Sequence, residues 1–215
     1  MSTPHTHSWS PRRLHALDAA LIDELATVLI DCVEGGASVS FMHPLTRDRA
    51  VAFWQSVARG VAAGERALLV AEDARGVCGT VQLILEQPEN QPHRAELSKM
   101  LVHRRARRQG LGAALMRAAE ATARQCGKTL LVLDTASDAA ERLYERMGWV
   151  RVGAIPGYAL LPHGGLCGTT VYYRTLDGQL DPLDLSISGS LKRLAVDPGA
   201  LEARDEIRRG ETPCN

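Results

Sequence analysis

The order of apolar and polar positions predicts two amphipathic helices in the first part of the chain. Apolar residues recur on one helical face from about Ala19 to Val33, and Gly35-Gly36 ends that segment. Thr46 is a suitable N-cap for a second helix that runs to about Ala62. The loop between them, 36–42, is small and partly apolar, which is unusual for a connector that only faces water.

Strand patterns dominate the rest of the chain, and they predict a mixed α/β fold. A strand, a glycine loop, a helix and a continuous apolar strand follow one another between 94 and 133, and the apolar run is typical of a parallel strand buried on both faces. A short helix is expected to start at Asp138 as its cap, with Glu141 completing a capping box, and to stop at Gly148. A Gly/Pro-rich loop is expected at 155–168. The expected strands are 67–72, 77–86 (a hairpin with the first), 94–102, 129–133, 149–153 and 169–175.

Length and composition predict one domain, 1–176, and a C-terminal appendage, 177–215, that is partly disordered or a short docking helix. The 25 basic residues balance the 25 acidic ones, so no overall field favours nucleic acid or an anionic membrane as a partner. Acidic residues interrupt the most apolar stretch, 16–33, so no membrane span is expected. The five scattered cysteines fit reduced thiols and a cytoplasmic location. No metal site is expected, because His5 and His7 lack a third ligand nearby.

The candidate chemistry centres on the loop Arg107-Arg108-Gln109-Gly110-Leu111-Gly112. Glycines between a strand and a helix let backbone N–H groups approach a phosphate, and the helix N-terminus adds a partial positive charge. An ordinary tight turn is the alternative, but the arginines beside the loop favour an anionic ligand. Arg104 and Arg105 either reach a further phosphate or form a solvated basic turn.

Arg107-x-x-Gly110-x-Gly112 resembles the acetyl-coenzyme A signature of the GNAT superfamily of N-acetyltransferases, and the order of elements from Trp9 to Leu176 is similar to that fold. Within the superfamily, the chain looks most like the tabtoxin resistance acetyltransferases, which inactivate a β-lactam amino-acid toxin. The segments that carry this closer resemblance are Gly35 to Met42, Arg94-Ala95-Glu96, Leu133-Asp134-Thr135 and Pro156-Gly157-Tyr158.

The resemblance implies a mixed sheet that is splayed open between the strands 94–102 and 129–133, with acetyl-CoA in the opening. It implies that the backbone of Met100, Leu101 and Val102 pairs with the pantetheine arm like an added strand. The loop Arg107 to Gly112 would then surround the diphosphate.

Acetyl transfer to an amine requires removal of a proton from the nucleophile, stabilisation of an oxyanion and an acid for the departing thiolate. The resemblance assigns Glu96 and Asp134 to handling of the amine. The plainer alternatives are that Glu96 is an exposed strand residue and that Asp134 is a turn or helix-start residue. It assigns Tyr144 to the thiolate. Tyr144 also belongs to an apolar stripe at i, i+3, i+4 and i+7 on its helix, so it either donates this proton or fills the core.

The loops 36–42 and 155–168 are expected to form the acceptor pocket, with Ser38, Phe41 and Tyr158 in its lining; a core or surface tyrosine is the alternative for Tyr158. The predicted activity is direct acetyl transfer from acetyl-CoA to a primary amine of a small molecule, such as the toxin tabtoxinine-β-lactam, which would confer toxin resistance. The alternatives are acetylation of a protein or peptide amine and non-catalytic binding of an acyl-CoA. Dimers are common in this superfamily, so the resemblance allows a homodimer.

Overall fold

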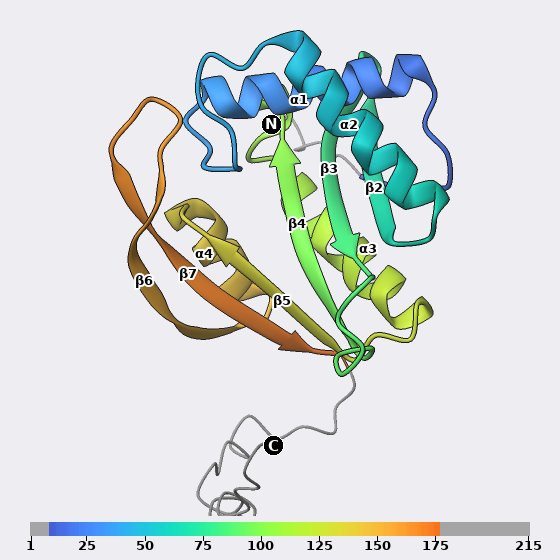
Figure 1. The fold of residues 1–215 in the computed structure, drawn as a ribbon, viewed down its shortest axis with the longest axis vertical. Helices are drawn as coiled ribbons and strands as arrows, with labels where there is room; N and C mark the ends of the chain where they lie inside the picture. Colours follow the sequence, from blue (N-terminus) through green and yellow to red (C-terminus); the bar gives the residue numbers. More distant parts are fainter. Residues whose placement is uncertain (1–8, 177–215) are drawn as a thin grey trace, which may run out of the picture. The chain divides into compact units, whose positions relative to one another are not determined.

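The computed structural model describes residues 9–176, so the predicted appendage 177–215 and the two histidines near the N-terminus lie outside the described residues. The strands form one seven-stranded sheet in the order β1-β2-β3-β4-β5-β7-β6 (Figure 1). Among the strands within residues 9–176, only the β4–β5 pair is parallel, so the predicted mixed α/β fold is confirmed. The elements are β1 (Arg12–Leu14), α1 (Ala19–Glu34), α2 (Arg47–Ala62), β2 (Arg66–Asp73), β3 (Gly76–Ile84), β4 (Arg94–Val102), the 3-10 helix η1 (Arg104–Ala106), α3 (Leu111–Gln125), β5 (Leu130–Thr135), α4 (Asp138–Arg146), β6 (Val150–Leu160) and β7 (Leu166–Thr175).

Helices cover both faces of this sheet and divide the core into two apolar clusters. The helices α1 and α2 pack on one face, whereas α3 and α4 pack on the other (Figure 1). Alternate residues of β2 separate accordingly, because Leu69 belongs to the α3 cluster and Leu68 and Val70 belong to the α1–α2 cluster. Trp54 of α2 is the largest fully buried side chain. Because helices cover both faces of the sheet, the strands are held in fixed positions. The candidate site lies where two of these strands, β4 and β5, diverge.

The helix ends follow the predicted capping chemistry at most positions. Thr46 caps α2, with its hydroxyl accepting the N–H of Arg49 at 3.4 Å. Gly148, at φ 78°, follows the end of α4 in the left-handed conformation. The predicted cap of α4 is wrong: Ser137 is the N-cap and Asp138 is the first helical residue. The capping box is therefore absent, and the carboxylate of Glu141 instead accepts hydrogen bonds from the hydroxyls of β7.

The C-terminal part of the sheet differs most from the sequence prediction. The expected loop 155–168 is instead the continuation of β6 and β7, joined by a short connector at 161–165. Pro156 misled the prediction, but a proline is tolerated here because β6 is an edge strand and its register shifts between Ile155 and Ala159. β5 is parallel to β4 as predicted, but only Leu131 and Leu133 are fully buried, so the expectation of burial on both faces is wrong.

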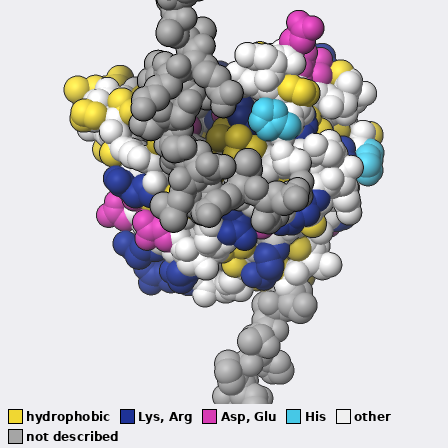
Figure 2. All heavy atoms as spheres, turned by 90° about the horizontal axis from the view of Figure 1, so that it is seen from below, with side chains coloured by type: hydrophobic (Ala, Val, Ile, Leu, Met, Phe, Trp, Pro, Cys, Tyr) yellow, Lys and Arg dark blue, Asp and Glu magenta, His cyan; other side chains and the backbone are white. Residues whose placement is uncertain are grey.

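Charged side chains of both signs share the face seen in Figure 2, where several Lys and Arg side chains lie beside acidic and uncharged ones. No helix within residues 9–176 is long and apolar enough to cross a membrane.

Large apolar side chains are exposed mainly on the β6–β7 hairpin, with Leu166 73% and Val152 64% exposed. An exposed apolar set of this kind is typical of an interaction surface.

Candidate active site at the divergence of two strands

The parallel strands β4 and β5 pair at one end only and then separate. Their register covers Arg94 to Glu96 on β4 and Leu130 to Val132 on β5. Beyond that point β4 stays paired with β3, and β5 stays paired with β7, so the two halves of the sheet diverge (Figure 1). The predicted splay is confirmed. The edge of β4 that faces β5 therefore carries backbone groups without a strand partner from Leu97 to Val102, which is what an added strand requires.

A β-bulge interrupts β4 within this unpaired stretch. Val81 of β3 lies opposite two residues of β4, Lys99 and Met100, and Lys99 has the unusual φ of 49°. Because Lys99 is an extra residue, the side chains before and after it alternate as if it were absent. Ala95 and Leu97 face the α3 cluster before the bulge, and Met100 and Val102 pack against that same cluster after it.

The predicted phosphate loop has the backbone geometry of an anion site. Gly110 is the N-cap of α3 in the left-handed conformation at φ 79°, and Arg108 is also left-handed at φ 60°. No side chain caps α3, and the described part of the chain offers no acceptor to the N–H groups of residues 110–113. The helix N-terminus therefore presents free donors and a partial positive charge.

Gly112 lies in the first turn of α3, where space is restricted. A Cβ at this position would approach Leu143 Cδ2 of α4 at 3.0 Å and Met100 Cε of β4 at 3.4 Å. The missing side chain thus keeps the helix end close to both β4 and α4. This brings the loop, the open edge of β4 and the helix α4 together.

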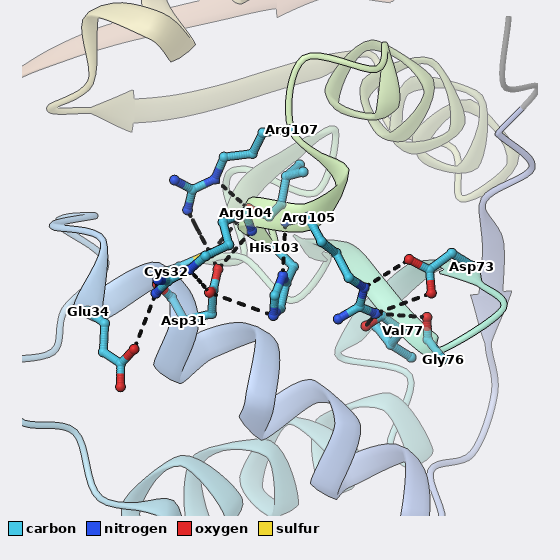
Figure 3. Close-up of polar contacts among 11 residues, drawn as sticks. Asp31, Cys32, Glu34, Asp73, Gly76, Val77, His103, Arg104, Arg105 and Arg107 are labelled. Carbon is cyan, nitrogen blue, oxygen red and sulfur yellow. Dashed lines mark hydrogen bonds and ion pairs between the residues drawn. The ribbon is translucent and has the colours of Figure 1, made fainter. Parts of the chain in front are cut away.

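The arginines around this loop are mostly held by protein groups (Figure 3). Arg105 donates to Asp73 and to the carbonyls of Gly76 and Val77 in the β2–β3 turn, so it is neither solvated nor free to reach a phosphate. Both alternatives considered for Arg105 are therefore wrong. Arg107 donates to the carbonyl of Val102 at 2.9 Å, with its guanidinium turned toward α1.

Asp31 of α1 is a buried anchor that the sequence analysis missed. It is 7% exposed, accepts the backbone N–H of Arg104 at 2.9 Å and also binds the guanidinium of that residue. Arg107 and His103 lie 3.9 and 3.6 Å from its carboxylate (Figure 3). An acidic residue on the buried face of an amphipathic helix rarely lacks a cationic partner, and this was the available signal.

His103 completes this anchor from the end of β4. Its Nδ1 accepts the N–H of Arg105 at 3.2 Å, which places the ring proton on Nε2, toward Asp31. Burial lowers the pKa of His103; Asp31 opposes this shift, and the neighbouring arginines add to it. The neutral form of the ring is therefore favoured at pH 7. Through Asp31 and His103, α1 contacts the segment that leads into the phosphate loop.

The two carboxylates assigned to the amine lie on the same face of the sheet. Glu96 pairs with Val132, and Asp134 follows two residues later on β5, so both project from the face that α1 and α2 cover. Asp134 accepts the hydroxyl of Thr169 at 2.6 Å. Both carboxylates raise the pKa of Lys99, which places all three groups in one region.

The two segments expected to form the acceptor pocket do meet, although one is a hairpin end and not a long loop. The N–H of His43 donates to the carbonyl of Pro162 at 2.9 Å, and Cys167 Sγ lies 3.8 Å from the hydroxyl of Ser38. Phe41 packs edge-on against Phe53 of α2, with ring centroids 5.3 Å apart.

Tyr158, on β6, is 56% exposed, and its place in the acceptor pocket stays a prediction.

Tyr144 lies in the α3 cluster, as the apolar stripe of its helix indicated. Its ring centroid is 5.9 Å from Trp149 and 5.8 Å from Tyr172. Burial raises the pKa of the phenol, and Asp134 adds to the rise. The hydroxyl has no hydrogen-bond partner among residues 9–176, yet it is not among their fully enclosed unpaired polar atoms. It therefore reaches the edge of the core as a protonated donor without a protein acceptor.

Comparison with known proteins agrees with this architecture. Three solved structures share the fold: yncA from Salmonella typhimurium with its cofactor acetyl-CoA (20% identity, 81% of this chain and 98% of that chain, TM-score 0.65), a GNAT superfamily phosphinothricin acetyltransferase from Sinorhizobium meliloti in complex with acetyl-CoA (18%, 78% and 88%, 0.64) and a ribosomal-protein-alanine N-acetyltransferase from Brucella melitensis (22%, 77% and 99%, 0.63). The family model for the acetyltransferase (GNAT) family matches residues 22–149, a span that begins within α1 and includes the diverging strands and α4. The chain belongs to the acetyltransferase (GNAT) family.

Proposed function

We propose that this protein transfers the acetyl group of acetyl-CoA directly to a primary amine of a small molecule. The observation that carries the proposal is the junction of two unpaired backbone features, the open edge of β4 and the uncapped N-terminus of α3. Structures of the same fold from Salmonella and Sinorhizobium contain acetyl-CoA, which supports this cofactor. Acetyl-CoA supplies the acetyl thioester that the amine attacks.

The residues of this chain fit such a cofactor. The unpaired backbone of Met100 to Val102 would bind the amide groups of the pantetheine arm in the manner of an added strand. The free N–H groups at Gly110 to Gly112, together with the helix dipole, would bind the diphosphate. Arg108 has no protein partner among the described residues and is the side chain best placed to add a positive charge.

The reaction needs a base for the amine and a hydrogen-bond donor for the departing sulfur. Either Glu96 or Asp134 would accept the proton of the acceptor's ammonium group, because both face the α1–α2 side of the diverging strands. Tyr144 would donate a hydrogen bond to the departing sulfur. Because its pKa is raised above that of a thiol, complete proton transfer is uphill, and the hydroxyl would stabilise the sulfur as it gains charge.

A small acceptor is favoured over a protein or peptide. The hydrogen bond between His43 and Pro162 and the contact of His163 Nε2 with the carbonyl of Glu34 at 3.1 Å join the β6–β7 connector to the α1–α2 loop. These contacts close one end of the region where an extended peptide would lie. Within the small-molecule class, amino-acid-like toxins are the proposed acceptors. Phosphinothricin acetyltransferases share the fold, and the Gly35 to Met42 segment resembles the tabtoxin resistance acetyltransferases.

The test is thiol release from acetyl-CoA with a panel of amines that includes tabtoxinine-β-lactam, phosphinothricin, amino acids, polyamines and peptides with free N-termini. Turnover of small amines supports the proposal, and tight acetyl-CoA binding without turnover of any amine favours the acyl-CoA-binding alternative. Gly112→Val is the control, because its side chain would collide with Leu143 and Met100 and should weaken acetyl-CoA binding about a hundredfold.

We also propose a homodimer through the β6–β7 hairpin. β6 is an edge strand with free backbone groups, and apolar side chains such as Val152 and Leu166 are exposed on the hairpin. Sedimentation velocity should show a dimer that Leu166→Glu converts to a monomer. A monomeric parent protein at micromolar concentration would refute the homodimer.

A further inference from the structure

Lys99 is the one lysine whose backbone and side chain are both unusual within residues 9–176. It is the inserted residue of the β4 bulge, and its left-handed φ of 49° is strained for a residue with a Cβ. A bulge re-aims the side chain that it carries, and such strain persists where the surrounding structure requires that direction. We therefore expect this lysine, in the diverging part of β4, to have a function that requires its direction.

The ammonium group of Lys99 is half-buried and has neutral partners. Its Nζ donates to the hydroxyl of Ser40 at 3.2 Å and lies 5.8 Å from the centre of the Phe53 ring. No carboxylate within the described residues comes within 4.0 Å of it. Burial lowers its pKa, while Asp134 and Glu96 raise it and Arg66 lowers it further.

This arrangement leaves a positive charge incompletely compensated. An ammonium group has three donors, and only one of them is used within the described residues. Withdrawing a charge from water without a counter-ion is unfavourable, so a lysine with a purely structural role would pair with an acidic side chain or extend into solvent. Ser40 is itself left-handed, at φ 73°, which directs its short side chain from the α1–α2 loop to this cation.

We propose that Lys99 binds the carboxylate of an amino-acid-like acceptor, so that the substrates of this enzyme are α-amino acids. Lys99, Glu96 and Asp134 together present one positive and two negative groups in one region, which matches the carboxylate and the amine of a zwitterion. The carboxylate would take the unused donors of Lys99, and the amine would face the two carboxylates. This inference rests on the proposed acetyl transfer and narrows the class of its substrate.

The experiment compares acceptors that differ only in the carboxylate. A panel of L-amino acids and phosphinothricin is assayed beside the matching α-carboxamides with the parent protein, Lys99→Met, Lys99→Arg and the control Arg59→Met. Methionine is similar in length to lysine but carries no charge. Arg59 is an exposed cation on the same helix as Phe53, and its side chain makes no hydrogen bond or ion pair within residues 9–176. Calorimetry with acetyl-CoA reports whether each variant is folded and loaded.

For the parent protein we expect kcat/KM to be about ten- to a hundredfold higher for the acid than for its amide. Lys99→Met should abolish this preference by lowering kcat/KM for the acid alone, Lys99→Arg should keep part of it, and Arg59→Met should keep all of it. Turnover without a preference for acids, or a preference that survives in Lys99→Met, would overturn the inference while leaving acetyl transfer intact. Failure of the parent to acetylate any amine would instead overturn the proposed function.

Discussion

Asp31 provides the sharpest test of how α1 supports the phosphate loop. In Asp31→Ala the backbone N–H of Arg104 loses its acceptor, and His103 and Arg107 lose the carboxylate that they face. A buried donor left without a partner costs about 1–3 kcal/mol, and a charged acceptor places the loss toward the upper end of that range. Because the guanidinium of Arg104 is exposed, it adds little to this figure. We therefore expect the free energy of unfolding to fall by about 2–3 kcal/mol.

The same change should loosen the segment that leads into the phosphate loop, so acetyl-CoA affinity should fall about tenfold. Urea unfolding of the free protein and calorimetry with acetyl-CoA measure the two effects separately. Glu34→Gln is the matched control, because Glu34 also binds Arg104, at 3.2 Å, but is exposed. If Asp31→Ala unfolds at the same urea concentration as Glu34→Gln, Asp31 does not anchor this segment.

Two further predictions concern protons. Tyr144→Phe should keep the melting temperature and acetyl-CoA affinity, because the hydroxyl has no protein partner within residues 9–176, while single-turnover acetyl transfer slows roughly a hundredfold; an unchanged rate with lowered stability would leave Tyr144 as a core residue only. Because the pKa of His103 is lowered in the folded protein, the unfolded chain binds a proton at this ring more readily than the folded one. The contribution of the neutral ring to the free energy of unfolding is therefore fully present above the unfolded pKa of about 6.5. It is lost as the pH falls below that value. His103→Asn keeps an acceptor for the Arg105 N–H but does not titrate, so the decrease in unfolding free energy between pH 7.5 and 5.5 should be smaller than in the parent; equal decreases would show that His103 does not cause it.

Local signals in the sequence predicted most of the fold. The apolar stripe of α1, the Thr46 cap and the limits of β4 depend on neighbouring residues only, and the structure confirms them. The glycines at 110 and 112 likewise indicated the loop by a local requirement for backbone freedom. Where the prediction failed, a tertiary contact decided the outcome. Pro156 interrupts a strand pattern in the sequence, but the edge position of β6 removes the need for its missing N–H.

The sequence predicted the phosphate loop of the candidate site but not the residues whose roles depend on tertiary contacts. Asp31 and Lys99 lie in ordinary helix and strand patterns, and neither has a motif around it. Their importance comes from partners 73 and 59 residues away, Arg104 and Ser40. A sequence pattern can show that a buried acid or a strand lysine needs a partner, but it cannot show which distant residue provides it.

The bulge at Lys99 connects the two halves of the proposed reaction. Because Lys99 is an extra residue, Met100 and Val102 stay on the α3 face that Ala95 and Leu97 also occupy, and Met100 Cε lies beside Gly112. The same residue turns its own side chain to Ser40 on the opposite face, where the acceptor is proposed to bind. One extra residue in β4 thus adds a cation in the region of Glu96 and Asp134 and leaves the neighbouring side chains of the strand on their faces. Removing Lys99 from the chain would leave Met100 in step with Ala95 and Leu97, so this deletion should impair acceptor recognition and largely retain acetyl-CoA binding, which calorimetry with acetyl-CoA measures.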